Sequence, residues 1–231
     1  MPKPSKPTAV VTGASRGIGR AVALRLAHDY DIVAVARSDD ELETLALEIE
    51  KRGGSCRPRQ VDITNPAAVE AALSDVDAQV LVNNAGVGML KPFMELTRAE
   101  WTQMVNVNFN ALFDVTRAVL PPMIERKSGH IVFIGSITGR SAFPGGTAYA
   151  GTKHAVMGMT ECLMLELREH GVKVSVVNPG SVATHFSERS DPSWMLAAQD
   201  VADAVAHVVA TPPNVLVHRV EIRTLTVPKK H

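Results

Sequence analysis

Tyr149 and Lys153 stand four residues apart at the start of residues 149–170, a segment whose pattern predicts a long helix. Residues i and i+4 lie on one face of a helix, so we expect the ammonium of Lys153 beside the phenolic oxygen of Tyr149. A neighbouring positive charge lowers the pKa of a phenol from its ordinary value of about 10. The pair therefore indicates a tyrosine tuned for proton transfer, although this spacing also arises by chance in helices.

The beginning of the chain has the pattern of a strand, a glycine-rich turn and a helix start. Glycine permits a tight turn and a close approach of the backbone to a pyrophosphate, and the N-terminus of a helix attracts anions. The spacing is Gly-x-x-x-Gly-x-Gly and differs from the Gly-x-Gly-x-x-Gly fingerprint of other dinucleotide folds. Taken alone, the turn fits either dinucleotide binding or a structural role. The motif, which follows the β-branched run at residues 8–12, is Gly13-Ala14-Ser15-Arg16-Gly17-Ile18-Gly19.

Two further motifs follow apolar strands, Asn83-Asn84-Ala85-Gly86 and Asn178-Pro179-Gly180. With these four motifs in order, the chain resembles the short-chain dehydrogenase/reductase family. The resemblance runs from about Thr8 to about Thr184, and Ser136 stands at the family's separation from Tyr149. It implies an enzyme that transfers hydride between a nicotinamide cofactor and a secondary alcohol or ketone.

Strand-like and helix-like segments alternate along the chain, which is typical of a doubly wound parallel sheet with helices on both faces. We predict one Rossmann-type α/β domain over residues 8–231, with about seven strands, behind a proline-rich disordered tail at residues 1–7. The predicted strands are residues 8–12, 31–37, a third ending at 61–63, 79–82, 130–135, 172–177 and 215–222. The predicted helices follow Gly19 and Asn65 and cover residues 39–51, 97–127 (disturbed by Pro121 and Pro122), 149–170 and 200–210.

Charge and composition exclude several classes of function. The 24 basic and 24 acidic residues cancel, and no segment concentrates one sign, so neither nucleic-acid nor membrane-surface binding is supported. No apolar run reaches membrane-spanning length, and the N-terminus lacks the apolar region of a signal peptide. Cys56 and Cys162 are far apart and the eight histidines lack ligand spacing, which predicts no metal site and suits a reducing cytoplasm.

The end of the second predicted strand indicates which cofactor binds. Many dinucleotide sites place an acidic side chain there to accept hydrogen bonds from the adenosine ribose, whereas this chain has Arg37. A guanidinium cannot accept a hydrogen bond but pairs well with a 2′-phosphate, and the resemblance directs Arg16 to the same region. The pattern predicts NADP(H) in preference to NAD(H), with a solvated strand end as the alternative role for Arg37.

The resemblance implies further cofactor contacts along the chain. Each of them could equally be a turn residue, and Pro-Gly in particular is a common loop signal. The implied contacts are Gly13, Ser15, Ile18 and Gly19 in the turn, Asp62 and Ile63 at the adenine, Asn84, Ala85 and Gly86 at the ribose, Pro179, Gly180, Val182 and Thr184 at the nicotinamide, and Tyr149 and Lys153.

The family mechanism implies a role for each catalytic candidate. Ser136 would hold the substrate oxygen, Tyr149 would pass a proton to it, and Lys153 would tune the phenol and hold the nicotinamide ribose. An asparagine completes the set. The register with Ala111 and Phe113 selects Asn108, although the family more often has glycine at the position of Ala111, and Asn106 remains open.

The partners that we expect are a small-molecule substrate and a second copy of the chain. The apolar surface of residues 155–167 is wider than one core-facing stripe needs, so this helix and residues 101–119 are expected to form a homodimer or homotetramer. The alternative to an oligomer is that the apolar surface of residues 155–167 is fully buried within one subunit. A non-catalytic dinucleotide sensor on the same fold is the alternative function, which the intact catalytic set disfavours.

The segment after Thr184 stands where the resemblance implies a lid over the substrate. Its side chains and those of two earlier loops predict a largely apolar pocket for a small to medium ketone or secondary alcohol. Ordinary core or loop packing is the alternative for each of them. The candidate walls are Met89, Leu90, Phe93, Phe143, Phe186, Trp194 and Met195.

Overall fold

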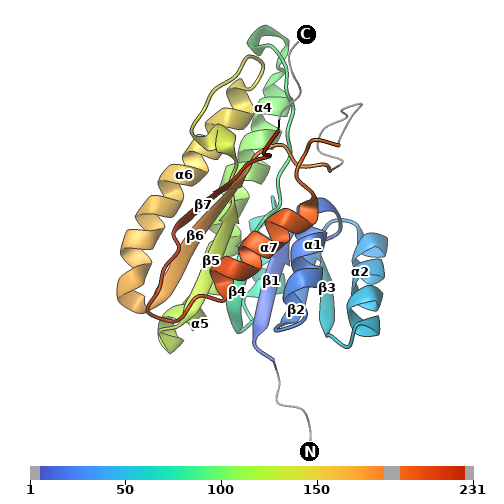
Figure 1. The fold of residues 1–231 in the computed structure, drawn as a ribbon, viewed down its shortest axis with the longest axis vertical. Helices are drawn as coiled ribbons and strands as arrows, with labels where there is room; N and C mark the ends of the chain where they lie inside the picture. The colour runs from blue at the N-terminus through green and yellow to red at the C-terminus, as the bar shows by residue number, and fades with distance from the viewer. Residues whose placement is uncertain (1–5, 185–192, 227–231) are drawn as a thin grey trace, which may run out of the picture.

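The computed structural model describes residues 6–184 and 193–226 (Figure 1). In these residues seven parallel strands form one sheet with the order β3-β2-β1-β4-β5-β6-β7. The order reverses between β1 and β4, which creates a crevice at the carboxyl ends of the strands, where ligands bind in open α/β sheets. The strands are β1 (Thr8–Thr12), β2 (Asp31–Ala36), β3 (Cys56–Gln60), β4 (Ala78–Asn83), β5 (Gly129–Ile134), β6 (Val172–Pro179) and β7 (Arg219–Ile222).

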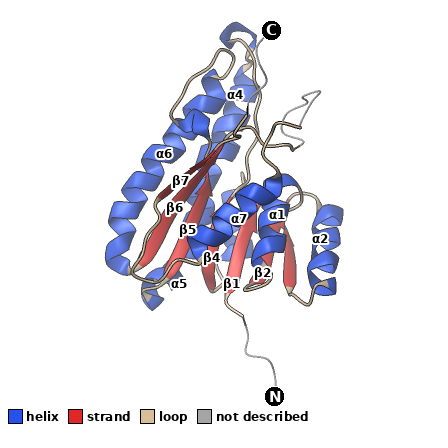
Figure 2. Ribbon diagram, viewed as in Figure 1, coloured by secondary structure: helices blue, strands red, loops and turns tan. Residues whose placement is uncertain are grey.

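Helices cover both faces of the sheet (Figure 2). Successive residues of β1 point to opposite sides, so Ala9 and Val11 pack with α1, α2 and α7, whereas Val10 packs with α3, α5 and α6. The predicted doubly wound, single-domain α/β fold is confirmed. The helices are α1 (Gly17–Leu26), α2 (Asp39–Lys51), α3 (Pro66–Leu73), α4 (Arg98–Val105), α5 (Ala111–Arg126), α6 (Thr147–Leu167) and α7 (Ala198–Val209).

The predicted long helix over residues 97–127 is wrong in one respect. Pro121 and Pro122 lie inside α5, and the interruption comes earlier, in a π-helical segment at Asn106–Asn110 between α4 and α5. Asn108 is buried in that segment and bonds to the backbone of Val87. Wide turns of this kind often occur at functional sites.

The last strand is shorter than the predicted 215–222. Val217 O accepts a hydrogen bond from the hydroxyl of Ser175 at 2.7 Å, and the ladder with β6 begins at His218, whose carbonyl accepts from Val176 N. A longer parallel strand would continue this ladder with a bond from His218 N to Val174 O. The ring of His218 takes that carbonyl instead, because its Nδ1 donates to Val174 O at 3.0 Å.

The predicted disordered tail at residues 1–7 also needs correction at its end. Lys6 Nζ donates to the carbonyls of Ala27 and His28, and Pro7 O accepts from Asp31 N. Residues 1–5 of that predicted tail lie outside the described residues.

A buried histidine in β5 is expected to make the stability of the fold depend on pH. His130 Nε2 lies 2.7 Å from Ser175 Oγ, and because Ser175 gives its proton to Val217 O, the imidazole must be the donor. Burial, with a smaller contribution from Lys173, lowers the pKa of His130 to about 4. The folded state thus binds the proton less well than the unfolded chain. The free energy of unfolding is therefore unaffected by His130 above the unfolded pKa of about 6.5. It falls as the pH decreases from there toward about 4, because the unfolded chain takes up the proton first.

We expect unfolding by urea to show this loss directly. Between pH 7.5 and pH 5, His130 alone should remove about 2 kcal/mol of the free energy of unfolding. His130→Gln can still donate to Ser175 but does not titrate, so its stability should depend less on pH by that amount. An equal pH dependence in the two proteins would contradict the assignment.

Candidate active site

A cleft of about 1280 Å³ opens at the carboxyl ends of the strands. Loops that follow β1, β2, β3, β4, β5 and β6 all contribute to its walls. Of the predicted site residues, two that the structure describes lie outside the lining, Gly19 and Asn108. Those that line it are Gly13, Ser15, Arg16, Ile18, Arg37, Asp62, Ile63, Asn84, Ala85, Gly86, Ser136, Tyr149, Lys153, Pro179, Gly180, Val182 and Thr184.

The glycine-rich turn is fixed by contacts with the loop after β4. Thr12 Oγ1 accepts hydrogen bonds from Asn84 N at 3.0 Å and Ala85 N at 3.2 Å, while Asn84 Nδ2 donates to Thr12 O at 2.9 Å. Gly13 has a positive φ of 64°, and a Cβ there would lie 2.9 Å from Ala85 Cα. A Cβ at Gly19 would collide with Gly13 O. Gly19 therefore acts by letting α1 approach the turn and not by facing the cleft.

The outer part of the cleft carries two exposed cations. Arg16 immediately precedes α1, and Arg37 immediately follows β2. Asp62, in the loop after β3, also lines the cleft and accepts from Thr64 N at 2.9 Å and from Thr64 Oγ1 at 2.7 Å. These hydrogen bonds, with a smaller attraction from Arg37, lower the pKa of Asp62. The carboxylate thus remains ionised close to a guanidinium at neutral pH.

The inner part of the cleft brings Ser136 and Tyr149 together. Ser136 follows β5 and begins a short 3₁₀ turn, Ile137–Gly139, while Tyr149 lies in the first turn of α6. A hydrogen bond from Ser136 stabilises the phenolate of Tyr149. Asn178 Oδ1 holds Ser136 from the other side by accepting from its backbone N at 3.1 Å. The structure thus brings together two of the catalytic candidates that the resemblance implies.

Lys153 lies beneath the tyrosine and is buried, with 7% of its surface exposed. Its Nζ donates to Ile134 O at 2.9 Å and lies 5.8 Å from the centroid of the Tyr149 ring. Burial lowers the pKa of Lys153 to about 8. Burial also raises the pKa of Tyr149, and the bond from Ser136 offsets this only in part. The net direction for Tyr149 is opposite to the one predicted, because the sequence carries no information on how deeply the phenol is buried.

The two asparagine candidates occupy different environments. Asn108 is buried, its Nδ2 donating to Val87 O at 2.8 Å and Thr152 Oγ1 at 3.2 Å, and its Oδ1 accepting from Val87 N at 2.8 Å. It joins the loop after β4 to α6. Asn106 lines the cleft and accepts from Asn110 Nδ2 at 2.9 Å. The residue selected by register is thus the one tied to the helix that carries Tyr149.

Comparison with known proteins identifies the family of this chain. The family model for short chain dehydrogenases matches residues 7–193. The chain belongs to the short-chain dehydrogenase/reductase family. It is 38% identical to oxidoreductase UcpA of Salmonella typhimurium over 194 residues, which cover 81% of this chain and 74% of the relative.

Two solved structures extend the likeness over almost the whole chain. A metagenomic short-chain oxidoreductase in complex with NADP is 33% identical with a TM-score of 0.86, and the match covers 96% of this chain and 99% of that one. An alcohol dehydrogenase from the archaeon Thermococcus sibiricus, complexed with 5-hydroxy-NADP, is 29% identical with a TM-score of 0.91 over 98% and 100% of the two chains. This chain is therefore an NAD(P)-dependent oxidoreductase of the family.

The residues of this short-chain dehydrogenase suit a dinucleotide. Gly17 and Ile18 at the start of α1 line the cleft, so the amides of the first turn can meet a pyrophosphate. Within residues 6–184 and 193–226, by contrast, no cluster of side chains could hold a metal ion. Among the helices of the same residues, none has the length and apolar character that a membrane span needs.

Sequence reasoning missed several residues of this dehydrogenase's cleft. Ser38 and Glu41 lie beside Arg37, and Thr138 lies two residues after Ser136. Ser38 and Glu41 could have been found from the sequence, because they stand at the start of α2, just after the end of β2. Nothing in the sequence marked Thr138, because its contacts depend on the 3₁₀ turn that follows β5.

Proposed function

We propose that this enzyme reduces a ketone, or oxidises the corresponding secondary alcohol, with NADP(H), and that Tyr149 transfers the proton. The observation that supports this most is the placement of Ser136, Tyr149 and Lys153 at one end of a cleft whose other end carries Arg16 and Arg37. A cofactor bound along this cleft supplies hydride at its nicotinamide ring.

Each of the three inner residues has a chemical task in this proposal. The hydroxyl of Ser136 orients the substrate oxygen and stabilises the charge that develops on it. Tyr149 gives its proton to that oxygen in the direction of reduction. Lys153, whose pKa is about 8, is mostly protonated at neutral pH and stabilises the phenolate that remains. Asn108 positions α6 through its bond to Thr152.

Preference for the phosphorylated cofactor rests on the two outer arginines. Both are exposed and line the cleft, so each is available to a 2′-phosphate, and a charge-assisted hydrogen bond contributes about 1.5–3 kcal/mol. We expect NADPH to bind more tightly than NADH in fluorescence titrations. Arg37→Asp should weaken NADPH binding by roughly 10- to 100-fold and strengthen NADH binding.

Arg57→Asp is a matched control for Arg37→Asp. Arg57 is exposed on β3 and does not line the cleft, and its substitution changes the net charge equally. It should leave the ratio of the two affinities unchanged. Tighter binding of NADH than of NADPH by the wild type would refute the preference.

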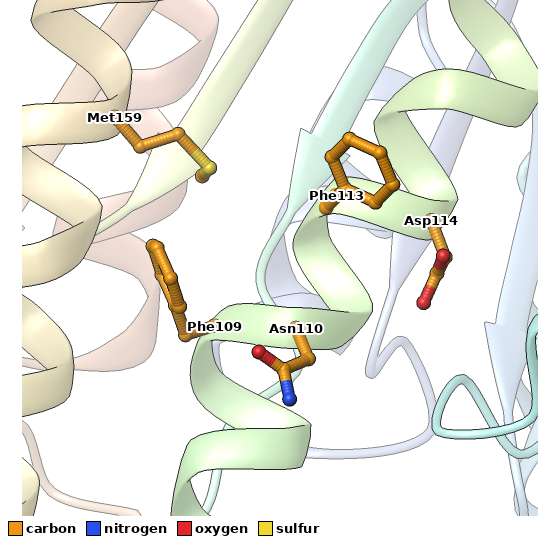
Figure 3. A pocket seen from close by; sticks show the side chains of 5 residues that line it. All are labelled: Phe109, Asn110, Phe113, Asp114 and Met159. Carbon is orange, nitrogen blue, oxygen red and sulfur yellow. The ribbon is translucent and has the colours of Figure 1, made fainter.

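An apolar depression on the outside of α5 and α6 supports a homo-oligomer. Phe109, Phe113 and Met159 line a pocket of about 440 Å³ there (Figure 3), with Phe113 57% exposed. Leu165, on α6, is 52% exposed, so this helix is not fully buried within one subunit. We propose that this face packs against a second copy of the chain.

Light scattering tests the proposed interface. We expect the wild type to be at least a dimer at micromolar concentration, and Phe113→Glu to shift it toward the monomer. Leu47→Glu is the control, because Leu47 is also 57% exposed but lies on α2, which covers the opposite face of the sheet. A monomeric wild type, or equal dissociation by both variants, would overturn the interface.

We further propose an apolar ketone or its alcohol as the substrate. Leu90 and Phe143, together with Ile137 and Val107, contribute apolar surface to the cleft. Met89, Phe93, Trp194 and Met195 do not line it, and Phe186 lies outside the described residues. Among the described residues, two of the predicted wall residues, Leu90 and Phe143, therefore line the cleft.

A further inference from the structure

The hydroxyl of Ser136 is held by Thr138, two residues further along the chain. Ser136 Oγ lies 3.1 Å from Thr138 N and 2.9 Å from Thr138 Oγ1. Both contacts place a donor on the serine oxygen. A hydroxyl has two lone pairs and one proton, so these two bonds occupy its accepting capacity.

With both lone pairs occupied, Ser136 has only its own proton left to offer. That proton is directed at Tyr149, since the bond between them stabilises the phenolate. The hydroxyls of Thr138, Ser136 and Tyr149 therefore form a row in which each donates to the next. If the oxygen of Ser136 could accept a further hydrogen bond, the hydroxyl of Tyr149 could donate to it. The phenolic proton would then point away from the substrate oxygen, to which it must be transferred during reduction.

We propose that Thr138 is a positioning residue that fixes the hydroxyl of Ser136 as a donor, toward Tyr149 in the free enzyme and toward the substrate oxygen once the substrate is bound. This rests on the proposed function and deepens it. Thr138 is half-buried and lines the cleft. Asn178 already fixes the backbone of Ser136, so rotation of the serine hydroxyl is the freedom that Thr138 removes.

The two contacts from Thr138 separate a structural from a chemical role. The bond from Thr138 N to Ser136 Oγ caps the 3₁₀ turn, and it survives any substitution of the Thr138 side chain except proline. The bond from Thr138 Oγ1 is lost in Thr138→Val, which keeps the shape of the side chain, and is kept in Thr138→Ser. Comparing these two variants isolates the hydroxyl.

The chain contains two tyrosines, Tyr30 and Tyr149, which permits a test that needs no substrate. In a Tyr30→Phe background, the ultraviolet absorbance of phenolate reports on Tyr149 alone. We expect Thr138→Val to move the rise in absorbance upward by about half to one pH unit, and Thr138→Ser to leave it in place. Circular dichroism of the same samples limits the comparison to pH values at which all variants are folded.

A kinetic arm uses a carbonyl that the wild type reduces. We expect Thr138→Val to lower kcat about tenfold with the KM for NADPH unchanged, Thr138→Ser to restore kcat, and Thr138→Val to add nothing in a Ser136→Ala background. The same absorbance curve for Thr138→Val and Thr138→Ser would overturn the proposal. Additive effects of Thr138→Val and Ser136→Ala on kcat would overturn it as well. A wild type that reduces no carbonyl defeats the proposed function, whereas the absorbance comparison still decides the role of Thr138.

Discussion

Tyr149→Phe is expected to lower kcat by roughly 10²- to 10⁴-fold, the range that a positioned acid or base supplies. The phenyl ring keeps the packing of the half-buried side chain and loses only the hydroxyl that Ser136 contacts. The fold and most of the affinity for NADPH should therefore be preserved. Steady-state kinetics and a fluorescence titration on the same preparation measure both quantities.

Tyr30→Phe provides the matched control. Tyr30 is half-buried, packs against the hydrophobic core beside α1 and does not line the cleft. Its substitution removes the same hydroxyl from the other tyrosine and should leave kcat close to that of the wild type. Near wild-type turnover in Tyr149→Phe would contradict the assignment of proton transfer.

Lys153→Met is expected to damage function and stabilise the unliganded fold. In the proposed function the ammonium of Lys153 stabilises the phenolate of Tyr149 and holds the nicotinamide ribose, so kcat and the affinity for NADPH should both fall. Its folded-state pKa of about 8 lies below the ordinary value of 10.5, so burying the charge costs stability at pH 7. We expect a gain of about 2 kcal/mol in the free energy of unfolding, after allowing for the bond lost to Ile134 O.

The pH dependence of this gain has a definite sign. The cost of the buried charge is complete below about pH 8, where folded Lys153 is protonated, and it disappears as the pH approaches 10.5, where the unfolded side chain also loses its proton. In denaturant unfolding, the stability gain of Lys153→Met over the wild type should therefore be smaller at pH 10 than at pH 7. Lys51→Met, at an exposed lysine at the end of α2, should show neither effect. A destabilised Lys153→Met protein at pH 7 would contradict the electrostatic account.

Local signals explain why much of the fold was predictable. The strand Thr8–Thr12 and the helix Asp39–Lys51 have their predicted bounds, because β-branched residues, an acidic first turn and a closing Gly53-Gly54 are all local. The π-helical segment was not predictable, since Asn108 is turned inward by the backbone of Val87, which is distant in sequence. The short β7 has a similar cause, because the ring of His218 takes the carbonyl of Val174, which is also distant in sequence.

The site divides in the same way. Parallel strands bring their carboxyl ends together, so motifs that follow apolar strands predict the cleft lining well. Burial and hydrogen-bond direction depend on the whole fold. This is why the direction of the pKa shift of Tyr149, the structural place of Gly19 and the contacts of Thr138 could not be predicted.

One measurement tests NADPH-dependent carbonyl reduction at Tyr149 most directly. Wild type and Tyr149→Phe are followed for NADPH oxidation against a panel of ketones, 3-oxo esters, acyl thioesters, steroids and sugars, with NADPH binding measured in parallel. We expect the wild type to reduce at least one apolar ketone and the variant to bind NADPH without turnover. Tight binding of NADPH with no turnover on any member of the panel would contradict the account and favour a dinucleotide sensor.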